Sequence, residues 1–384
     1  MKTWDVIIVG GGIIGLSLSI ALRKRGAKVL VVERGEPGRE ASHAAGGMLV
    51  GGPMETPAAL QPLAAASAAM YPEFAYELEI ESGMKVDLRD RGTILFLTKE
   101  HLGHPQFREL FHQVDLEEQE PNLGMPPHEE ELEQRFSLKD SDLETSHEEF
   151  AELCGWRFKN AFHVQERSVD PRALTAAAFK VAKNRGVDFS TGDAVTTVNC
   201  SDGHTAGVTT VKTTFLAAKV VNCAGAWSGQ IGPHSFPTRP VKGQMLCLVM
   251  PKRDLIRHVI RTPKVYLIPR SDGRLLVGAT VEEAGFDKRT DVATIQRLHQ
   301  AALELVPRLA DARILEDWAG LRPGTPDALP ILGATETPGY YVATGHFRDG
   351  ILLAPVTAAV MADVIEGRKP EYDLNPFTPG RFSA

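Results

Sequence analysis

The chain has 384 residues, 43% of them hydrophobic and 24% charged, which is an ordinary globular composition and more chain than one hydrophobic core usually serves. Its net charge of −7 at pH 7 argues against general nucleic-acid binding, which needs a basic surface. The sequence contains no run of about 20 apolar residues and no signal-peptide pattern, so we expect neither a membrane-spanning helix nor export.

The chain opens with a strand, a glycine-rich turn, a helix and a second strand. Residues 5–10 (DVIIVG) form a short β-branched apolar run, which is typical of a buried parallel strand. A helix is expected over residues 12–26, where apolar side chains recur every four residues, and residues 28–33 (KVLVVE) form the next strand. This order within about 30 residues predicts a βαβ unit.

The remaining elements are read from the same patterns. Residues 35–52 are rich in Gly, Ala and Ser and are expected to be largely irregular, and the acidic residues 113–146 to form surface helices and loops. The sequence predicts helices over residues 57–84, 171–185 and 350–366, and strands over residues 92–98, 219–223, 244–249, Tyr266–Pro269, Arg274–Gly278 and Tyr340–Thr344.

The four cysteines indicate a reducing compartment. Cys154, Cys200, Cys223 and Cys247 fit neither a zinc site nor a dense disulfide framework. We therefore expect reduced thiols in a cytoplasmic protein, with Cys223 and Cys247 in the core.

The glycine-rich turn, residues 10–15 (GGGIIG), carries the first chemical signal. Gly10 permits the tight turn, Gly12 lets the backbone approach a pyrophosphate, and Gly15 lets the helix pack close to the sheet. The helix N-terminus offers N–H groups to phosphates, and Glu33 ends the second strand, where a carboxylate binds ribose hydroxyls. Together these features predict an adenine dinucleotide.

A second glycine turn favours FAD over a nicotinamide cofactor. Residues 344–350 (TGHFRDG) open the last helix, and residues 220–228 (VVNCAGAWS) run from a strand into another turn of small residues. A second positive helix end suits the pyrimidine edge of a reduced, anionic flavin. Judged alone, the turn could also be an ordinary capped helix.

The sequence resembles glycine oxidase, a bacterial relative of D-amino-acid oxidase and monomeric sarcosine oxidase. The resemblance covers nearly the whole chain in order and is weakest across residues 102–157. It rests on residues 39–49 (REASHAAGGML), 241–243 (VKG), 266–270 (YLIPR), 273–280 (GRLLVGAT), 318–327 (WAGLRPGTPD) and 345–355 (GHFRDGILLAP).

The resemblance implies three residues at the substrate. Arg322 matches the arginine that pairs with the substrate carboxylate, and an arginine between glycines in an apolar stretch is also a plausible carboxylate clamp on physical grounds. Tyr266 matches a tyrosine that bonds the same carboxylate, and Arg348 matches a second arginine nearby. The alternatives are a structural ion pair for Arg322, a packing role for Tyr266 and a surface position for Arg348.

Nucleotide-binding features occur at both ends of the chain and again near Val220, so we expect interleaved domains. The prediction is an α/β fold in which a Rossmann-like FAD-binding domain (1–85, 150–230 and 325–384) is interleaved with a mostly antiparallel-sheet substrate-binding domain (86–149 and 231–324). The resemblance also implies cofactor contacts. Met48 would pack beside the flavin or serve as a core residue. The expected FAD contacts are Gly10, Gly12, Ile13, Ile14, Gly15, Glu33, Arg34, Ser42, Ala44, Ala45, Gly46, Gly47, Met48, Val195, Ala224, Gly225, Trp227, Gly320, Arg322, His346, Phe347, Arg348, Gly350, Ile351 and Leu352.

Departures from the family pattern bear on substrate and cofactor. Val281 stands where relatives have a pocket-lining methionine, which puts strict glycine preference in doubt, and Gly51-Gly52-Pro53 makes an unusual turn. Sarcosine-oxidase relatives attach flavin to a cysteine near the Arg322 segment. Leu321 and Pro323 flank Arg322 here, so we expect non-covalent FAD and no metal.

The resulting hypothesis is oxidative deamination of a small amino acid, glycine favoured. Hydride transfer to flavin N5 would give an imino acid, then a 2-oxo acid and ammonia, with oxygen reoxidising the flavin to release hydrogen peroxide. The resemblance implies a homo-oligomer, a tetramer, and a product used in thiamine synthesis. The alternatives are a D-amino-acid oxidase, a secondary-amine oxidase or dehydrogenase acting on sarcosine or proline, and a non-catalytic flavin-binding assembly protein.

Overall fold

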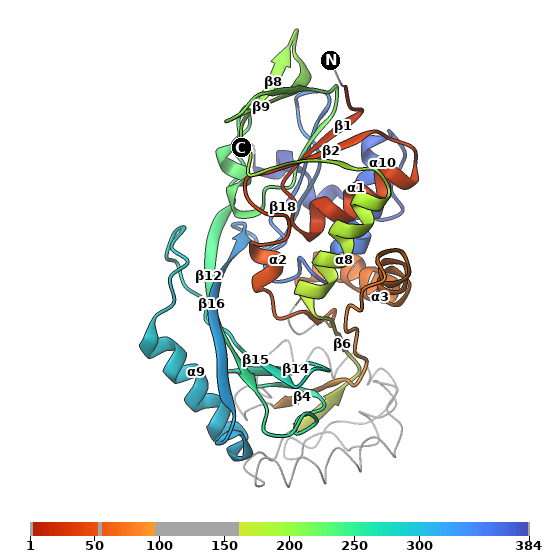
Figure 1. Cartoon of the computed structure of the whole chain (residues 1–384). Helices are drawn as coiled ribbons and strands as arrows, with labels where there is room; N and C mark the ends of the chain where they lie inside the picture. Colours follow the sequence, from red (N-terminus) through yellow and green to blue (C-terminus); the bar gives the residue numbers. More distant parts are fainter. Residues whose placement is uncertain (1–2, 53–55, 97–160, 383–384) are drawn as a thin grey trace, which may run out of the picture.

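A computed structural model describes residues 3–52, 56–96 and 161–382, arranged around two sheets. The expectations for residues 113–146 and Cys154 lie outside these ranges. Figure 1 shows the sheet with β1 and β2 in the upper part of the molecule and the sheet with β14 and β15 in the lower part, with the long strands β12 and β16 running between them. In the described part, no helix is both long and apolar enough to cross a bilayer.

The first sheet has six strands, and the βαβ unit forms its centre. Its order is β17-β18-β11-β1-β2-β7, and every neighbouring pair is parallel except β17 with β18. The strands are β1 (Val6–Val9), β2 (Val29–Glu33), β7 (Asp188–Thr191), β11 (Val220–Asn222), β17 (Ile331–Ala334) and β18 (Tyr340–Thr344).

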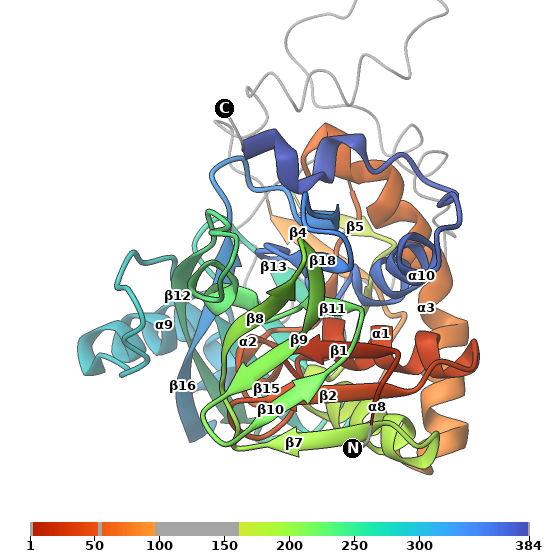
Figure 2. The same ribbon diagram turned by 90° about the horizontal axis from the view of Figure 1, so that it is seen from above.

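The two faces of this sheet are covered by different layers. Because side chains alternate along a strand, Val6 and Ile8 pack with the helices while Ile7 and Val9 pack against a small three-stranded sheet. The helical layer holds α1 (Ile13–Lys24), α8 (Pro171–Asn184), α10 (Ala354–Ile365) and α3 (Gln61–Ser82), and the small sheet holds β8 (Val195–Ser201), β9 (His204–Thr210) and β10 (Thr214–Leu216). Figure 2 shows β8, β9 and β10 lying across β1 and β2.

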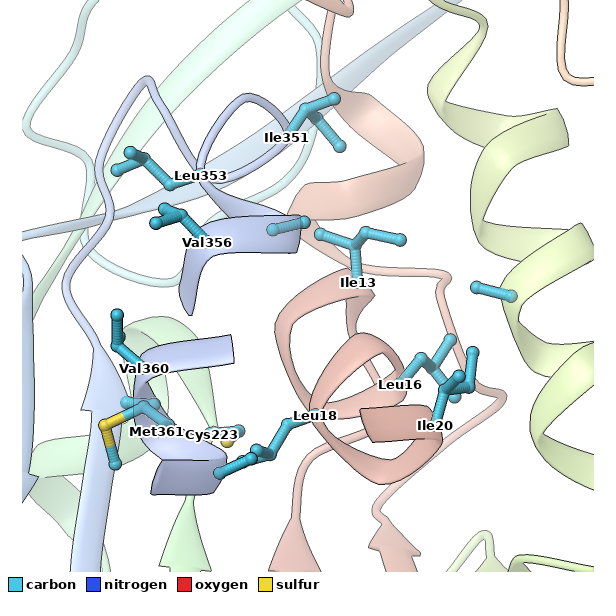
Figure 3. Packing of buried hydrophobic residues seen from close by; sticks show 14 of the residues in the cluster. Ile13, Leu16, Leu18, Ile20, Cys223, Ile351, Leu353, Val356, Val360 and Met361 are labelled. Atoms are coloured by element: carbon cyan, nitrogen blue, oxygen red, sulfur yellow. The ribbon is translucent and has the colours of Figure 1, made fainter. Parts of the chain in front are cut away.

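Helices α1 and α10 pack directly on each other. Leu16 and Leu18 of α1 belong to the same buried cluster as Val356, Val360 and Met361 of α10, as Figure 3 shows. Burying a side chain of this size contributes about 1.5–3 kcal/mol. This contact joins the glycine turn before α1 to the second glycine turn before α10.

The second sheet has seven strands and is antiparallel except where β13 meets β4. Its order is β16-β12-β15-β14-β13-β4-β5, and α9 (Val292–Leu305) covers one face through Ile295 and Leu298. Met245 and Cys247 lie on the opposite face. The strands are β4 (Thr93–Phe96), β5 (Ala161–Val164), β12 (Arg239–Val249), β13 (Val259–Arg261), β14 (Tyr266–Pro269), β15 (Arg274–Gly278) and β16 (Arg313–Gly324).

Short elements complete the chain. These are α2 (Ala41–Ala44), β3 (Met48–Leu49), β6 (Arg167–Ser168) and the 3-10 turns η1 (Ala58–Leu60), η2 (Gly225–Gln230), η3 (Pro307–Leu309), η4 (Asn375–Phe377) and η5 (Pro379–Phe382).

The predicted fold class, an α/β fold with a mostly antiparallel second sheet, is confirmed. The strands predicted over Tyr266–Pro269, Arg274–Gly278 and Tyr340–Thr344 occur with those bounds, and Cys223 and Cys247 are buried. β12 is longer than expected, and neither β16 nor α9 was predicted. β5 pairs with β4 in the seven-stranded sheet, although the expected boundary at residue 150 grouped it with the FAD-binding segments.

Candidate functional site

The glycine turn between β1 and α1 is held tightly against the neighbouring strand. Gly10 has φ +105°, and a Cβ there would lie 2.5 Å from the Cys223 carbonyl oxygen. A Cβ on Gly15 would overlap the Gly10 carbonyl, so Gly15 sets how closely α1 packs on the turn. Gly12 caps α1 without a side-chain hydrogen bond, and Ser42 Oγ accepts the Ile13 N–H at 3.0 Å. The turn therefore presents backbone to the space in front of α1.

Glu33 organises the same turn from the end of β2. Its two carboxylate oxygens accept the N–H groups of Gly11 at 2.7 Å and Gly35 at 2.8 Å. Each carboxylate oxygen can accept a second hydrogen bond, so a ribose hydroxyl is compatible with this arrangement. Beside it, the Arg34 guanidinium carbon lies 3.7 Å from the centroid of the Trp227 ring.

A cavity of about 870 Å³ starts at this turn and reaches the second sheet. That volume lies within the range of about 300–1,000 Å³ of small-molecule and cofactor sites. Of the residues predicted from the sequence, the following line it: Gly10, Gly12, Ile13, Ile14, Glu33, Arg34, Ser42, Ala44, Ala45, Gly46, Gly47, Met48, Val195, Ala224, Gly225, Trp227, Tyr266, Val281, Gly320, Arg322, His346, Phe347, Arg348, Gly350 and Ile351.

Two expected cofactor contacts lie elsewhere. Gly15 is buried beneath the first turn of α1, where it serves packing. Leu352 is 1% exposed and belongs to the helical core. Its carbonyl accepts the Ser67 hydroxyl at 2.6 Å, and the Ile351 carbonyl accepts the Tyr71 hydroxyl at 2.7 Å. α3 therefore anchors the second glycine turn through its backbone.

The far end of the cavity holds Arg322 of β16 and Tyr266 of β14, two strands of the second sheet with β12 and β15 between them. Arg322 Nη1 donates to the Thr280 carbonyl at 3.1 Å. Burial lowers the pKa of the Arg322 guanidinium, and the adjacent Tyr266 hydroxyl opposes this by hydrogen bonding to it. A Cβ on Gly243 would overlap the Arg322 guanidinium, and a Cβ on Gly278 would lie 2.7 Å from the Tyr266 ring. Glycine at these positions makes room for both side chains.

Two guanidinium groups make this end of the cavity cationic. Arg348 lowers the pKa of Arg322 by like-charge repulsion, and its own side chain is exposed at the cavity. Among the described residues no carboxylate forms an ion pair with either Arg322 or Arg348. Glu282 raises the pKa of Arg322 only from a distance, so two positive groups that no described carboxylate pairs with favour an anionic ligand. A carboxylate matches the arginine fork.

His346 lies in the second glycine turn as a neutral, buried side chain. It is 3% exposed, and its Nε2 lies 3.1 Å from the Thr357 hydroxyl of α10. Burial depresses its pKa to about 3. The side chain is therefore uncharged at neutral pH. A neutral imidazole can bond a polar edge of a ligand without adding charge to the site.

Replacing His346 with glutamine is expected to reduce the loss of stability on acidification. Between the ordinary pKa of 6.5 and about 3, the unfolded chain binds a proton at this histidine and the folded protein does not, so stability falls as the pH drops through that window. At pH 5 this difference in pKa lowers the free energy of unfolding by about 2 kcal/mol. Urea unfolding at pH 7.5 and pH 5 should show that the native protein loses about 2 kcal/mol more than the variant. Equal losses would contradict a buried neutral histidine.

Several cavity residues were not predicted from the sequence. Leu95 and Phe96 come from β4, residues 261–265 from the end of β13 and the turn to β14, and Met245 from β12. On the adenosine side, Thr196, Gln230 and Ile231 were also missed. Gly243 and Gly278, next to Arg322 and Tyr266, did carry a signal, because they lie within two motifs of the resemblance.

Comparisons with known proteins agree with this geometry. A family model described as FAD dependent oxidoreductase matches residues 5–364. Glycine oxidase of Geobacillus kaustophilus is 33% identical, over 98% of this chain and 96% of that protein. Its crystal structure superposes with a TM-score of 0.85 at 31% identity, covering 99% of both chains.

A second kind of relative is longer. The bifunctional protein ThiO/ThiG of Trichormus variabilis is 34% identical over 99% of this chain, and the chain spans only 55% of its length. The glycine turn before α1, the size of the cavity and the family match agree on the cofactor, FAD. The chain belongs to the family of FAD-dependent oxidoreductases.

Proposed function

We propose that this enzyme oxidises a small amino acid, with glycine as the favoured substrate. The observation that carries the proposal is the convergence of Arg322 and Tyr266 on the end of the cavity opposite the dinucleotide turn. A carboxylate bound there would leave the Cα and amine of a small amino acid beside the flavin-binding residues. The similarity to proteins named glycine oxidase supports the same substrate.

The chain's own residues would bind and orient the substrate. The Thr280 carbonyl accepts one N–H of Arg322, and the Tyr266 hydroxyl also bonds the guanidinium. These two contacts fix the guanidinium and leave its remaining donors for a carboxylate. Tyr266 adds a hydroxyl, and Arg348 supplies a second positive charge at the cavity mouth. FAD, when bound, supplies the acceptor for the hydride that leaves the substrate Cα. Holding the reactants in a fixed orientation is the main contribution of the protein.

The amine proton is expected to leave to solvent. His346 is the only histidine among the described residues that line the cavity, and its Nε2 already pairs with Thr357. Its pKa of about 3 makes it a poor base at neutral pH. The proposed substrate therefore reacts with its amine neutral, and the imino acid formed hydrolyses to a 2-oxo acid and ammonia.

Several finer statements belong to the same proposal. Oxygen would reoxidise the flavin and release hydrogen peroxide, and the product would enter thiamine synthesis, as the resemblance implies. FAD would be held non-covalently, because Leu321 and Pro323 flank Arg322 and offer no thiol. The protein would be a cytoplasmic homo-oligomer, and a tetramer is the expected form.

The deciding experiment mixes the holoenzyme anaerobically with glycine, sarcosine, proline and a set of D-amino acids while flavin absorbance is followed. Glycine should bleach the flavin fastest, and air should then restore the colour with release of peroxide. Acid precipitation should leave all the flavin in the supernatant. If no amino acid or amine bleaches the flavin, the proposal fails and a non-catalytic flavoprotein is favoured.

A D-amino-acid or secondary-amine oxidase is the second candidate. Val281 lines the cavity and is 56% exposed, so space remains beside it for a side chain or an N-substituent. Faster bleaching by sarcosine, proline or a D-amino acid than by glycine would select this candidate.

Replacing Gly243 with alanine is expected to raise KM for the preferred amino acid by about 10–100-fold, which corresponds to roughly 1.4–2.8 kcal/mol of lost binding. The new Cβ would displace the Arg322 guanidinium while leaving the strand pairing intact. Steady-state kinetics and FAD content check this prediction. The neighbours Lys242 and Gln244 contact Glu282 and not Arg322. The effect should therefore be confined to Arg322, and loss of FAD in the Gly243→Ala protein would contradict this prediction.

A further inference from the structure

Arg270 is a fully buried arginine directly behind the part of the cavity wall formed by residues 44–48 (AAGGM), here called the 44–48 loop. It follows β14 and is 1% exposed. Its Nη2 donates to the Gly46 carbonyl at 2.5 Å. Arg270 itself does not line the cavity, whereas all five residues of the 44–48 loop do.

The other hydrogen-bond donors of the Arg270 side chain are unpaired among the described residues. Among the described residues, Nε and Nη1 have no hydrogen-bond partner. Asp170, the carboxylate with the largest effect on the pKa of Arg270, already accepts from Arg274 at 2.6 Å and caps α8. Burial lowers the pKa of Arg270 to about 10, so the group is still charged at neutral pH. A buried charge with unused donors costs stability, and its retention calls for an explanation.

The geometry of the Gly46–Gly47 peptide explains why a charged Arg270 is retained. This peptide is trans, and in a trans peptide the C=O and N–H point in opposite directions. Since the Gly46 carbonyl points at Arg270, behind the wall, the Gly47 N–H points to the cavity side. Among the described residues this N–H has no acceptor. The Gly47 carbonyl is itself fixed by the Val169 N–H at 2.8 Å.

The loop can occupy this position only because it has no side chains there. A Cβ on Gly46 would lie 2.7 Å from the Ile268 side chain of β14, and a Cβ on Gly47 would overlap the Val169 carbonyl. Gly47 also has φ +79°, which favours glycine. The peptide is therefore held between Ile268 of β14, Val169 directly after β6, and Arg270.

We propose that Arg270 is a positioning residue for FAD that orients and polarises the Gly46–Gly47 peptide, so that the Gly47 N–H is a strong donor to the bound flavin. A cation bonded to a carbonyl draws electron density along the amide and strengthens the N–H on the other side. The same charge favours the reduced, negatively charged cofactor over the oxidised one. The inference rests on FAD binding, which the family shows, and is independent of which amine is oxidised.

The test uses two variants with opposite expected signs, measured without any amine substrate. Arg270→Gln removes the charge and should weaken FAD binding by the apoprotein at least about tenfold and make the flavin midpoint potential more negative. Asp170→Asn removes a negative charge next to Arg270, retains a residue able to cap α8, and should make the potential more positive. Fluorescence titration gives the affinity, and equilibration with a reference dye gives the potential.

Arg253→Gln is the matched control. Arg253 also donates to a backbone carbonyl, that of Ser271, but it is exposed and is not among the residues lining the cavity. Both readouts should match the native protein. A merely structural role for Arg270 would weaken FAD binding without moving the potential, and that result overturns the proposal. If the Arg270→Gln protein does not fold, an unchanged or more negative potential in Asp170→Asn overturns it equally.

Discussion

Replacing Arg322 with alanine is expected to lower kcat/KM for the preferred amino acid by about 10²–10⁴-fold, which corresponds to roughly 3–5 kcal/mol. The guanidinium is the group placed to pair with the substrate carboxylate, and its removal leaves that carboxylate with only the exposed Arg348 as a cationic neighbour. Most of the change should appear in KM, because the carboxylate contact is made before and during reaction. Arg322→Lys should recover only part of the loss, since an ammonium lacks the planar fork.

The Arg322→Ala protein should keep its flavin, and Arg313→Ala provides the control. Arg313 lies on the same strand, β16, but it is exposed and does not line the cavity. Its kinetics and FAD content should be those of the native protein. Unchanged amino-acid turnover in Arg322→Ala would remove the carboxylate clamp from the proposed function.

The βαβ unit could be predicted from the sequence because its determinants are local. The apolar run of residues 5–10, the glycines of the turn and the four-residue spacing of the following helix lie within one short segment, and each agrees with the others. The strands β14 and β15 were equally predictable, since a polar turn separates two short apolar runs.

Two of the elements that the sequence did not predict, β16 and α9, differ in the reason. β16 is the edge strand of its sheet, and its first half is exposed, so it carries charges where a buried strand would be apolar. α9 did carry a signal: Ile295, Leu298, Ala302 and Leu305 follow a helical spacing, and Asp291 caps the helix by accepting the Thr294 N–H at 2.8 Å.

The residues of the site also include some that a local sequence pattern predicts and some that it does not. The dinucleotide turn was predictable because its motif is contiguous, whereas Leu95, Phe96 and Met245 reach the cavity only when the second sheet forms. Arg270 was visible in the sequence as part of a motif, but its position behind the 44–48 loop depends on packing between the two sheets. No local pattern specifies such a contact.

Replacing Gly10 with alanine is expected to give a protein that purifies without FAD and binds it about 10²-fold more weakly or worse. The left-handed φ of +105° costs an alanine roughly 1–2 kcal/mol. The new Cβ would also lie 2.5 Å from the Cys223 carbonyl oxygen, a backbone atom that cannot move without disturbing β11. Both effects displace the turn that presents its backbone to the dinucleotide.

Gly26→Ala separates these two causes. Gly26 has φ +90°, but no atom lies within 4 Å of the position its Cβ would take, and it follows the far end of α1. This control should lose about 1 kcal/mol of unfolding free energy and keep native affinity for FAD. Flavin content, fluorescence titration and urea unfolding of both proteins measure the difference. If Gly10→Ala lost no more affinity for FAD than Gly26→Ala, the close approach of the turn to β11 would not govern cofactor binding.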